Sequence, residues 1–174
     1  MRLFVAAELP DSMLDALAET SAALRSSVRG RYVGSDLFHV TLAFLGEVES
    51  SRCAELEDAL SRSCAEHGPF ETSLGALGSF GKKSRATLWQ GFTETSAFDA
   101  LAGDVRKVLR EAGFAFDGKG FIPHVTLMRN ADLSSGILPM PSIAAGAIDT
   151  VTLFSSDLSG PRPVYDAITR ITLS

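Results

Sequence analysis

The sequence has few of the residues on which several protein classes depend. Its 174 residues include two cysteines, one tryptophan and three histidines. Cys53 and Cys64 lie 11 positions apart in a segment with helical spacing, which would separate their α-carbons by roughly 16 Å, too far for a disulfide. Reduced thiols are typical of cytoplasmic proteins, so we expect a cytoplasmic chain.

Long apolar runs are also absent. No stretch approaches the ~20 apolar residues of a membrane span. The apolar N-terminal segment is too short for the core of a signal peptide, and it ends at Glu8 and Pro10. We therefore expect neither a membrane partner nor a secretory signal.

An excess of positive charge is missing as well. The 16 Lys and Arg residues are outnumbered by 21 Asp and Glu residues, which gives a net charge of -5. Binding to duplex DNA or anionic membranes through bulk charge depends on Lys and Arg that neutralise phosphates, so the composition does not favour these partners. It is compatible with a pocket for a single phosphate. The length and the apolar content of 45% predict one domain, or two small lobes sharing one core.

Two of the three histidines lie in the same four-residue string. The string His-Val-Thr-Leu begins at His39 and again at His124, 85 positions later. Val, Thr and Leu favour strands, in which alternate side chains point to opposite faces. The histidine and threonine of each string would share one face, and the valine and leucine would pack into the core. Two such strands facing each other would bring two imidazoles and two hydroxyls to one small volume.

The pattern along the chain predicts strands and helices in an irregular order. The expected strands cover 2–8, 37–46, 70–80, 86–93, 121–128, 147–155 and 165–173. The expected helices run from Asp11 or Ser12 to Gly30, from Ser50 or Ser51 to about His67, and over 96–112. Residues 130–146 are expected to form a long surface loop. This order predicts an α+β fold with the helices outside, and the repeated string suggests two similar lobes facing across a cleft.

A pair of histidines and a pair of threonines could act together on a phosphate. At an ordinary pKa near ~6.5, one imidazole can be neutral while another is protonated. In-line displacement at phosphorus uses both, one as general base and one as general acid, while the threonine hydroxyls could donate to non-bridging oxygens. Arg129, five residues after His124, adds a cation for phosphate. Strict alternation would point Arg129 away from the histidine face, so this role requires the strand to end or twist there.

Other interpretations of these residues are weaker. A single histidine on an apolar strand is more often structural than catalytic, but two identical strings favour a paired site. Zinc is not favoured, because catalytic zinc usually has three protein ligands and the strings offer only His-x-Thr. No Gly-x-Ser-x-Gly turn supports a serine nucleophile. Trp89 is expected in the core, and a solvated helix face is expected at Arg106, Lys107 and Arg110.

Longer segments around the two strings resemble a known family. FHVTLAFLGEV and PHVTLMR resemble the HxTx motifs of the two-histidine phosphoesterases, and most closely those of the RNA 2',3'-cyclic phosphodiesterases, once named 2'-5' RNA ligases. MRLFVAAELP, ATLWQGF and VTLFSSDLSGPRPVY resemble the opening, middle and closing segments of that family. The resemblance implies a single bilobal domain over 1–174, with two mainly antiparallel sheets facing across a central cleft. It also implies metal-free hydrolysis of an RNA terminal 2',3'-cyclic phosphate to a 2'-phosphate.

The resemblance also implies roles for individual residues. His39 would protonate the departing 3' oxygen, and His124 would activate water. Phe44, in the first motif, would stack on a base, although strict alternation places it on the apolar face. The family's phosphate-binding positions fall on Thr41, Thr126 and Arg129.

The expected partner is an RNA terminus or a small nucleotide with a cyclic phosphate. We expect no cofactor, no metal and a monomer. Related reactions stay open, namely 2'-5' RNA ligation and hydrolysis of another cyclic nucleotide or of a 2',5'-linked oligonucleotide. An alternative of a different class is a noncatalytic module that binds RNA ends in the same cleft. Catalysis predicts that replacing either histidine abolishes turnover and leaves the fold intact, whereas structural histidines predict a lower melting temperature and no phosphate binding.

Overall fold

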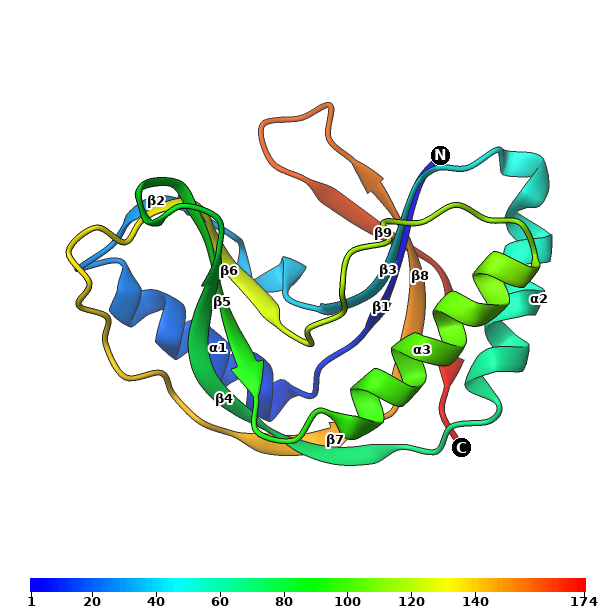
Figure 1. The fold of residues 1–174 in the computed structure, drawn as a ribbon, viewed down its shortest axis with the longest axis horizontal. Helices are drawn as coiled ribbons and strands as arrows, with labels where there is room; N and C mark the ends of the chain where they lie inside the picture. Colours follow the sequence, from blue (N-terminus) through cyan, green and yellow to red (C-terminus); the bar gives the residue numbers. More distant parts are fainter.

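Two antiparallel β-sheets and three α-helices make up the structure, a computed structural model that describes residues 1–174 (Figure 1). The strands are β1 (Arg2–Ala7), β2 (Arg29–Tyr32), β3 (Val40–Glu47), β4 (Phe70–Phe80), β5 (Ala86–Phe92), β6 (Val125–Asp132), β7 (Ala145–Ile148), β8 (Thr150–Asp157) and β9 (Val164–Thr172). The first sheet has the order β3-β1-β8-β9, and the second has the order β2-β6-β5-β4-β7. All neighbouring strands pair antiparallel. The expected α+β fold is confirmed.

The first strand forms the buried interior of the first sheet. β1 is an uninterrupted apolar run from Leu3 to Ala7, and all five residues are buried. Such runs are typical of strands that are covered on both faces. β1 pairs with β8 on one side and with β3, the edge strand that follows His39, on the other. The first motif is therefore built onto the best-packed strand of the molecule.

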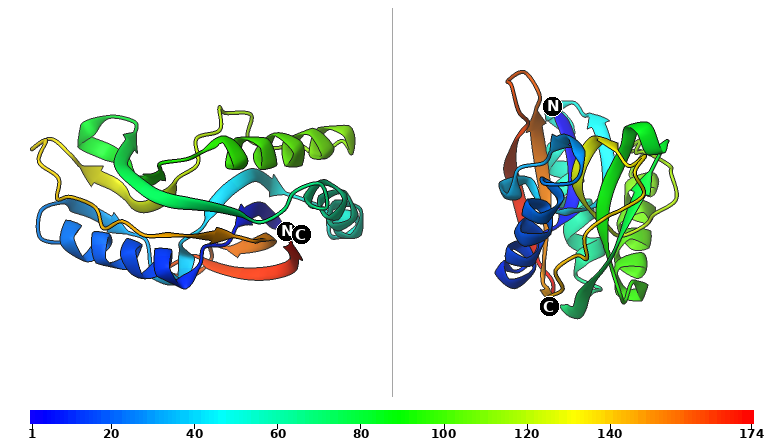
Figure 2. Two further views of the ribbon diagram at one scale, coloured as in Figure 1. Left: turned by 90° about the horizontal axis from the view of Figure 1, so that it is seen from below. Right: turned by 90° about the vertical axis from the view of Figure 1, so that its left-hand side faces the viewer.

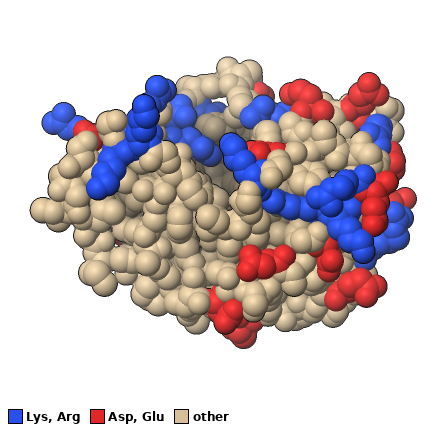
Figure 3. Space-filling model, in the orientation of Figure 1, with Lys and Arg blue, Asp and Glu red and all other residues tan.

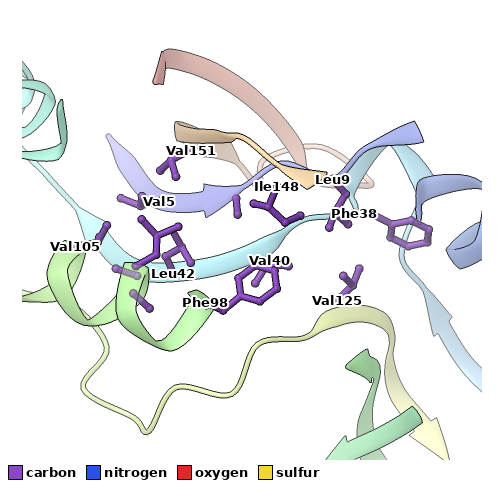
Figure 4. Close-up of a cluster of buried hydrophobic side chains, with 14 of the residues drawn as sticks. Val5, Leu9, Phe38, Val40, Leu42, Phe98, Val105, Val125, Ile148 and Val151 are labelled. Atoms are coloured by element: carbon purple, nitrogen blue, oxygen red, sulfur yellow. The ribbon is translucent and has the colours of Figure 1, made fainter. Parts of the chain in front are cut away.

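The three helices lie outside the sheets (Figure 2) and are α1 (Asp11–Leu24), α2 (Cys53–Cys64) and α3 (Ser96–Glu111). Each packs through apolar residues at helical spacing. Figure 4 shows Phe98 and Val105 of α3 beside Val40 and Leu42 of β3. All four side chains are buried, and burying a large apolar side chain contributes roughly 1.5–3 kcal/mol. Gly113, with φ of +73°, ends α3 in the left-handed conformation that favours glycine.

Several local expectations are wrong. The first helix ends at Leu24, not at Gly30, and residues Arg29–Tyr32 form β2 instead. The hydroxyls of Ser26 and Ser27 donate to helix carbonyls and so compete with continuation of the helix. The expected loop 130–146 contains the end of β6 and the beginning of β7. Since β2 and β7 are short edge strands whose partners lie far away in the sequence, local patterns do not reveal them.

The beginning of α1 also differs from the expectation. The residue that precedes the helix is Pro10, and no side chain caps the helix there. Ser12, one of the two residues at which the helix was expected to begin, donates its hydroxyl to the carbonyl of Ala145 at the start of β7. This hydrogen bond joins the first helix to the second sheet.

The two cysteines are free, and they lie at the first and last positions of α2. This agrees with the separation that their spacing predicted. Burial raises the pKa of the Cys64 thiol to about 11, so this thiol stays protonated at neutral pH. None of the helices has the length and apolar character needed to cross a bilayer.

Candidate active site

The two His-Val-Thr-Leu strings meet at one pocket that is lined from both sheets. The pocket encloses about 630 Å³. Each histidine lies directly before its strand rather than within it, His39 before β3 and His124 before β6. The lining includes every residue that was expected to act on or bind the substrate, namely His39, Thr41, Phe44, His124, Thr126 and Arg129. Residues 85 positions apart in the sequence are thus neighbours across one cleft.

The two imidazoles are held in the same way. Nδ1 of His39 lies 2.7 Å from the carbonyl oxygen of Leu37, and Nδ1 of His124 lies 2.6 Å from that of Ile122. A carbonyl oxygen can only accept, so Nδ1 carries the hydrogen in both rings and Nε2 of each neutral ring has a lone pair. Nε2 of His39 accepts from the Thr41 hydroxyl at 2.9 Å, whereas Nε2 of His124 has no protein partner. Nε2 of His124 is thereby free for a ligand, whereas Nε2 of His39 becomes available when the Thr41 hydroxyl turns away from it.

A β-bulge in the first motif places Phe44 beside the histidine. In the pairing of β3 with β1, Thr41 and Ala43 face consecutive residues of β1, so Leu42 is an extra residue. An extra residue reverses the alternation of side chains beyond it. Phe44 therefore shares the pocket face with Thr41, which strict alternation does not predict.

The second motif has a bulge at the equivalent position. Thr126 and Met128 face consecutive residues of β5, which leaves Leu127 as the extra residue. Arg129 then shares the pocket face with Thr126. Directly after it, Asn130 adopts a left-handed φ of 52° and bends the strand again. The sequence analysis placed Arg129 on the histidine face only if the strand ended or twisted before it. This bulge provides that change of face.

Burial lowers the pKa of both histidines. The pKa of His39 falls to about 4, mainly because its partly buried ring loses solvation, and the charges of His124 and Arg129 lower it further. The pKa of His124 is also lowered, first by burial and then by the charge of Arg129. The hydrogen bonds to the two carbonyls act in the opposite direction. Both imidazoles are therefore neutral at pH 7 in the free protein.

Aromatic rings enclose the first histidine. The ring centroid of His39 lies 4.9 Å from that of Phe4 on β1 and 5.5 Å from that of Tyr165 on β9. These contacts explain why the ring loses solvation. Sequence reasoning missed both residues, because they reach His39 only through the pairing of β1 with β3 and β8, and of β8 with β9.

Positive charge gathers at the pocket although the whole chain is acidic. The lining contains five arginines and no Asp or Glu. Figure 3 shows basic side chains around the hollow, with most acidic side chains away from it. Net charge could not reveal this, because the arginines converge from separate parts of the fold. They are Arg2, Arg25, Arg31, Arg129 and Arg162.

Arg106 connects the two motifs from outside the pocket. Its Nε donates to the carbonyl of Leu42, the bulge residue on the open edge of β3, at 2.9 Å. Its Nη1 donates at 2.9 Å to the carbonyl of Lys119, in the loop that leads to His124. The expected solvated role of Arg106 is wrong, because α3 packs on β3 and brings this side chain onto the strand edge. One guanidinium thus fixes the backbone of the first motif and of the loop that precedes the second.

The second histidine contacts a tryptophan that the sequence assigned to the core. Trp89 is only partly buried, and its ring centroid lies 5.6 Å from that of His124. The indole covers Gly78 of β4, where an added Cβ would lie 2.3 Å from the ring. Trp89 therefore supports the imidazole because position 78 carries no side chain.

We expect Gly78→Ala to displace the indole, to lower stability by about 1–3 kcal/mol and to reduce turnover. Gly103→Ala is the matched control, because an added Cβ there meets nothing within 4 Å. In the middle of α3 this change should stabilise by about 0.5–1 kcal/mol. Thermal unfolding and initial rates measure both effects. Unchanged turnover in Gly78→Ala would show that the indole does not position His124.

The arrangement is suited to an anion that undergoes proton transfer. Hydroxyl and guanidinium groups donate hydrogen bonds to oxyanions, and two imidazoles can exchange protons with a bound group. No group of three or more His, Cys, Asp or Glu side chains is placed to hold a metal ion.

Comparisons with known proteins agree with this chemistry. Residues 13–140 match the family model of the 2'-5' RNA ligase superfamily. The RNA 2',3'-cyclic phosphodiesterase of Escherichia coli is 31% identical over 99% of this chain and 97% of its own length. That of Geobacillus stearothermophilus is 34% identical over 72% of this chain, but the match spans only 41% of that relative. The crystal structure of E. coli LigT complexed with 3'-AMP superposes with a TM-score of 0.80 at 29% identity, over 99% of this chain and 98% of that one.

Proposed function

The chain belongs to the 2'-5' RNA ligase superfamily, and on that premise we propose that it is an RNA 2',3'-cyclic phosphodiesterase that leaves a 2'-phosphate. The observation that carries the proposal is the pair of imidazoles, each fixed through Nδ1 to a backbone carbonyl two residues before it, in one arginine-lined pocket. The naming of several relatives as RNA 2',3'-cyclic phosphodiesterases supports the substrate class. The 3'-AMP bound to the E. coli structure supports a nucleotide as the ligand.

We assign the two proton transfers as follows. Nε2 of His124, which has no protein partner, accepts a proton from water as the water oxygen attacks phosphorus. The bond from phosphorus to the 3' oxygen breaks, and Nε2 of His39 gives its proton to that oxygen. His39 must be protonated for this step. The negative charge of the bound cyclic phosphate favours the protonated imidazole and so opposes the effect of burial on its pKa.

The remaining pocket residues bind and orient the substrate. Thr41 and Thr126 lie on the histidine face of their strands. Protonation of His39 at Nε2 frees the single hydroxyl hydrogen of Thr41, so that both threonines donate to the non-bridging oxygens. Arg129 lines the same pocket and its charge lowers the pKa of both histidines, and it binds the phosphate through its guanidinium. Phe44 carries the guanidinium of Arg2 over its ring at 4.6 Å, and this pair provides a surface on which a base stacks.

Turnover of a short RNA with a 2',3'-cyclic phosphate end tests the proposal. The product should be the 2'-phosphate, and EDTA should leave the rate unchanged, since no step uses a metal. An acyclic 3'-phosphate RNA serves as the unreactive control. Binding of the cyclic end without turnover would favour a noncatalytic module, and loss of turnover with EDTA would contradict the metal-free mechanism.

The same assay should show a bell-shaped dependence of kcat/KM on pH with its maximum below pH 6.5. The profile reports the free enzyme, in which one imidazole must be neutral and the other protonated. The pair carries a single proton between the two pKa values, which are about 4 for His39 and below 6.5 for His124, and the fraction of the pair with that proton on His39 is constant over this range. Above pH 6.5 the rate constant should fall about tenfold per pH unit as the pair loses this proton. A maximum above pH 7 would contradict this pair as the acid and base.

Three broader properties complete the proposal. We take residues 1–174 as one two-lobed domain, because each sheet supplies one histidine and α3 joins both motifs through Arg106. A cytoplasmic compartment is supported by the two free cysteines. A monomer is sufficient, because one chain supplies every residue that the mechanism uses.

A further inference from the structure

We propose that Arg31, with Arg25, forms a second phosphate subsite that binds the phosphodiester preceding the cyclic end, so that the protein prefers an oligonucleotide to a cyclic mononucleotide. This inference rests on the proposed function. The pocket has more cationic groups than one cyclic phosphate needs, since five arginines line it. The question is therefore which anion the additional arginines bind.

Arg31 lies directly beside the arginine of the second motif. It is on β2, the edge strand of the second sheet, and its pairing partner on β6 is Arg129. Residues paired in this way have side chains on the same face, and both side chains line the pocket. Neighbouring strands lie ~4.8 Å apart, so Arg31 is placed one strand farther out than Arg129. A phosphate one nucleotide away from the reacting one fits this displacement.

Neither of these paired arginines has an acidic partner. The ion pairs of the protein involve other residues, and Arg162 of the same lining is paired with Asp36. Like charges that face each other across two strands destabilise a sheet. A bound polyanion removes this repulsion, because each guanidinium can form charge-assisted hydrogen bonds with phosphate oxygens. The uncompensated pair therefore favours a ligand with more than one anionic group.

Arg25 adds a further cation to the lining next to β2. Its guanidinium lies over the ring of Tyr32 at 4.8 Å, and Tyr32 is itself fixed by a hydrogen bond of 2.7 Å from its hydroxyl to the carbonyl of Val28. Arg25 and Tyr32 both line the pocket beside Arg31. Arginine and aromatic planes of this kind receive bases and phosphates of single-stranded RNA. The ligand suited to this end of the pocket is thus a second nucleotide.

Rates on three substrates distinguish phosphate binding at the subsite from binding of the reacting phosphate. These are uridine 2',3'-cyclic phosphate, the dinucleotide UpU with the same cyclic end, and that dinucleotide with an uncharged methylphosphonate linkage. We expect the wild type to have about tenfold higher kcat/KM on the charged dinucleotide than on the other two. Arg31→Ala should remove this preference, with less than a twofold change on the mononucleotide. It should also lower the slope of log kcat/KM against log salt concentration by about 0.7 on the dinucleotide.

Arg29→Ala is the matched control, because Arg29 lies on the same strand and carries the same charge but does not line the pocket. It should keep the dinucleotide preference. An equal loss on the mononucleotide and the dinucleotide in Arg31→Ala would assign Arg31 to the reacting phosphate and overturn the subsite. So would a preference that survives the substitution.

Failure of the proposed function gives a different result. If the wild type hydrolyses none of the three substrates, the dissociation constants of the 3'-phosphorylated mononucleotide and dinucleotide decide the question. The subsite then predicts about tenfold tighter binding of the dinucleotide, lost in Arg31→Ala and kept in Arg29→Ala. Equal affinities in the wild type would overturn it.

Discussion

Replacing His124 with alanine is expected to lower kcat on a cyclic-phosphate RNA by about 10²–10⁴-fold, the usual contribution of a positioned general acid or base. His39→Gln should cause a loss of the same order, and a polar side chain of similar size limits the cavity left among the aromatic rings around His39. The fold should persist in both variants. The measurements are initial rates at the optimum pH and thermal unfolding.

His67→Ala is the control for these variants. His67 is the third histidine, and it pairs with Asp104 outside the pocket. Its replacement should leave turnover within about twofold, because no proposed step uses it. If the pocket variants keep their turnover but unfold at lower temperature, the two motif histidines are structural and the assigned chemistry is wrong.

Arg106→Lys is expected to lower kcat by about 10²-fold with little change in KM. The guanidinium donates to two carbonyls in different segments, and a lysine ammonium lacks the planar fork that reaches both. A misplacement of ~1 Å in catalytic groups can cost this much in rate. The lost hydrogen bond should also lower stability by about 1–3 kcal/mol. Steady-state kinetics well below the unfolding transition separates the two effects.

Lys107→Ala tests whether the effect belongs to this position. Lys107 is the next residue of α3 and is exposed, so its replacement changes the helix charge without touching either motif. It should leave both kcat and stability nearly unchanged. A purely structural role for Arg106 would give an Arg106→Lys variant with lower stability and an unaltered kcat.

The sequence predicted the chemistry of the pocket better than its shape. Identical strings at His39 and His124 predicted that two imidazoles meet, because alternation in a strand is a local property. The positions of Phe44 and Arg129 were not predictable in this way, since each depends on a bulge defined by the partner strand. The alternation of side chains between the two faces of a strand is interrupted at an extra residue. Nothing in the string Val-Thr-Leu shows that its leucine is that extra residue.

Contacts that arise only from packing were also beyond the sequence. Arg31 joins the pocket because β2 pairs with β6, although β2 has only four residues. The pattern of α3 placed Phe98 and Val105 on its buried face correctly, yet Arg106 beside them was expected in solvent. The spacing of apolar residues in one helix shows which of its faces is buried. It does not show that a residue at the border of that face contacts the unpaired edge of a strand.

The equivalent bulges give the cleft a direction. Both motifs use the same backbone arrangement, so the acid-base groups alone would accept a nucleic acid strand in either of two opposite orientations. The residue that each bulge turns toward the ligand differs, an aromatic ring at Phe44 and a guanidinium at Arg129. A strand laid in backwards would place its base on the cation and its phosphate on the ring. We therefore expect the polarity of the bound chain to be set by Phe44, which stacks on a base, and by Arg129, which binds phosphate without exchanging a proton.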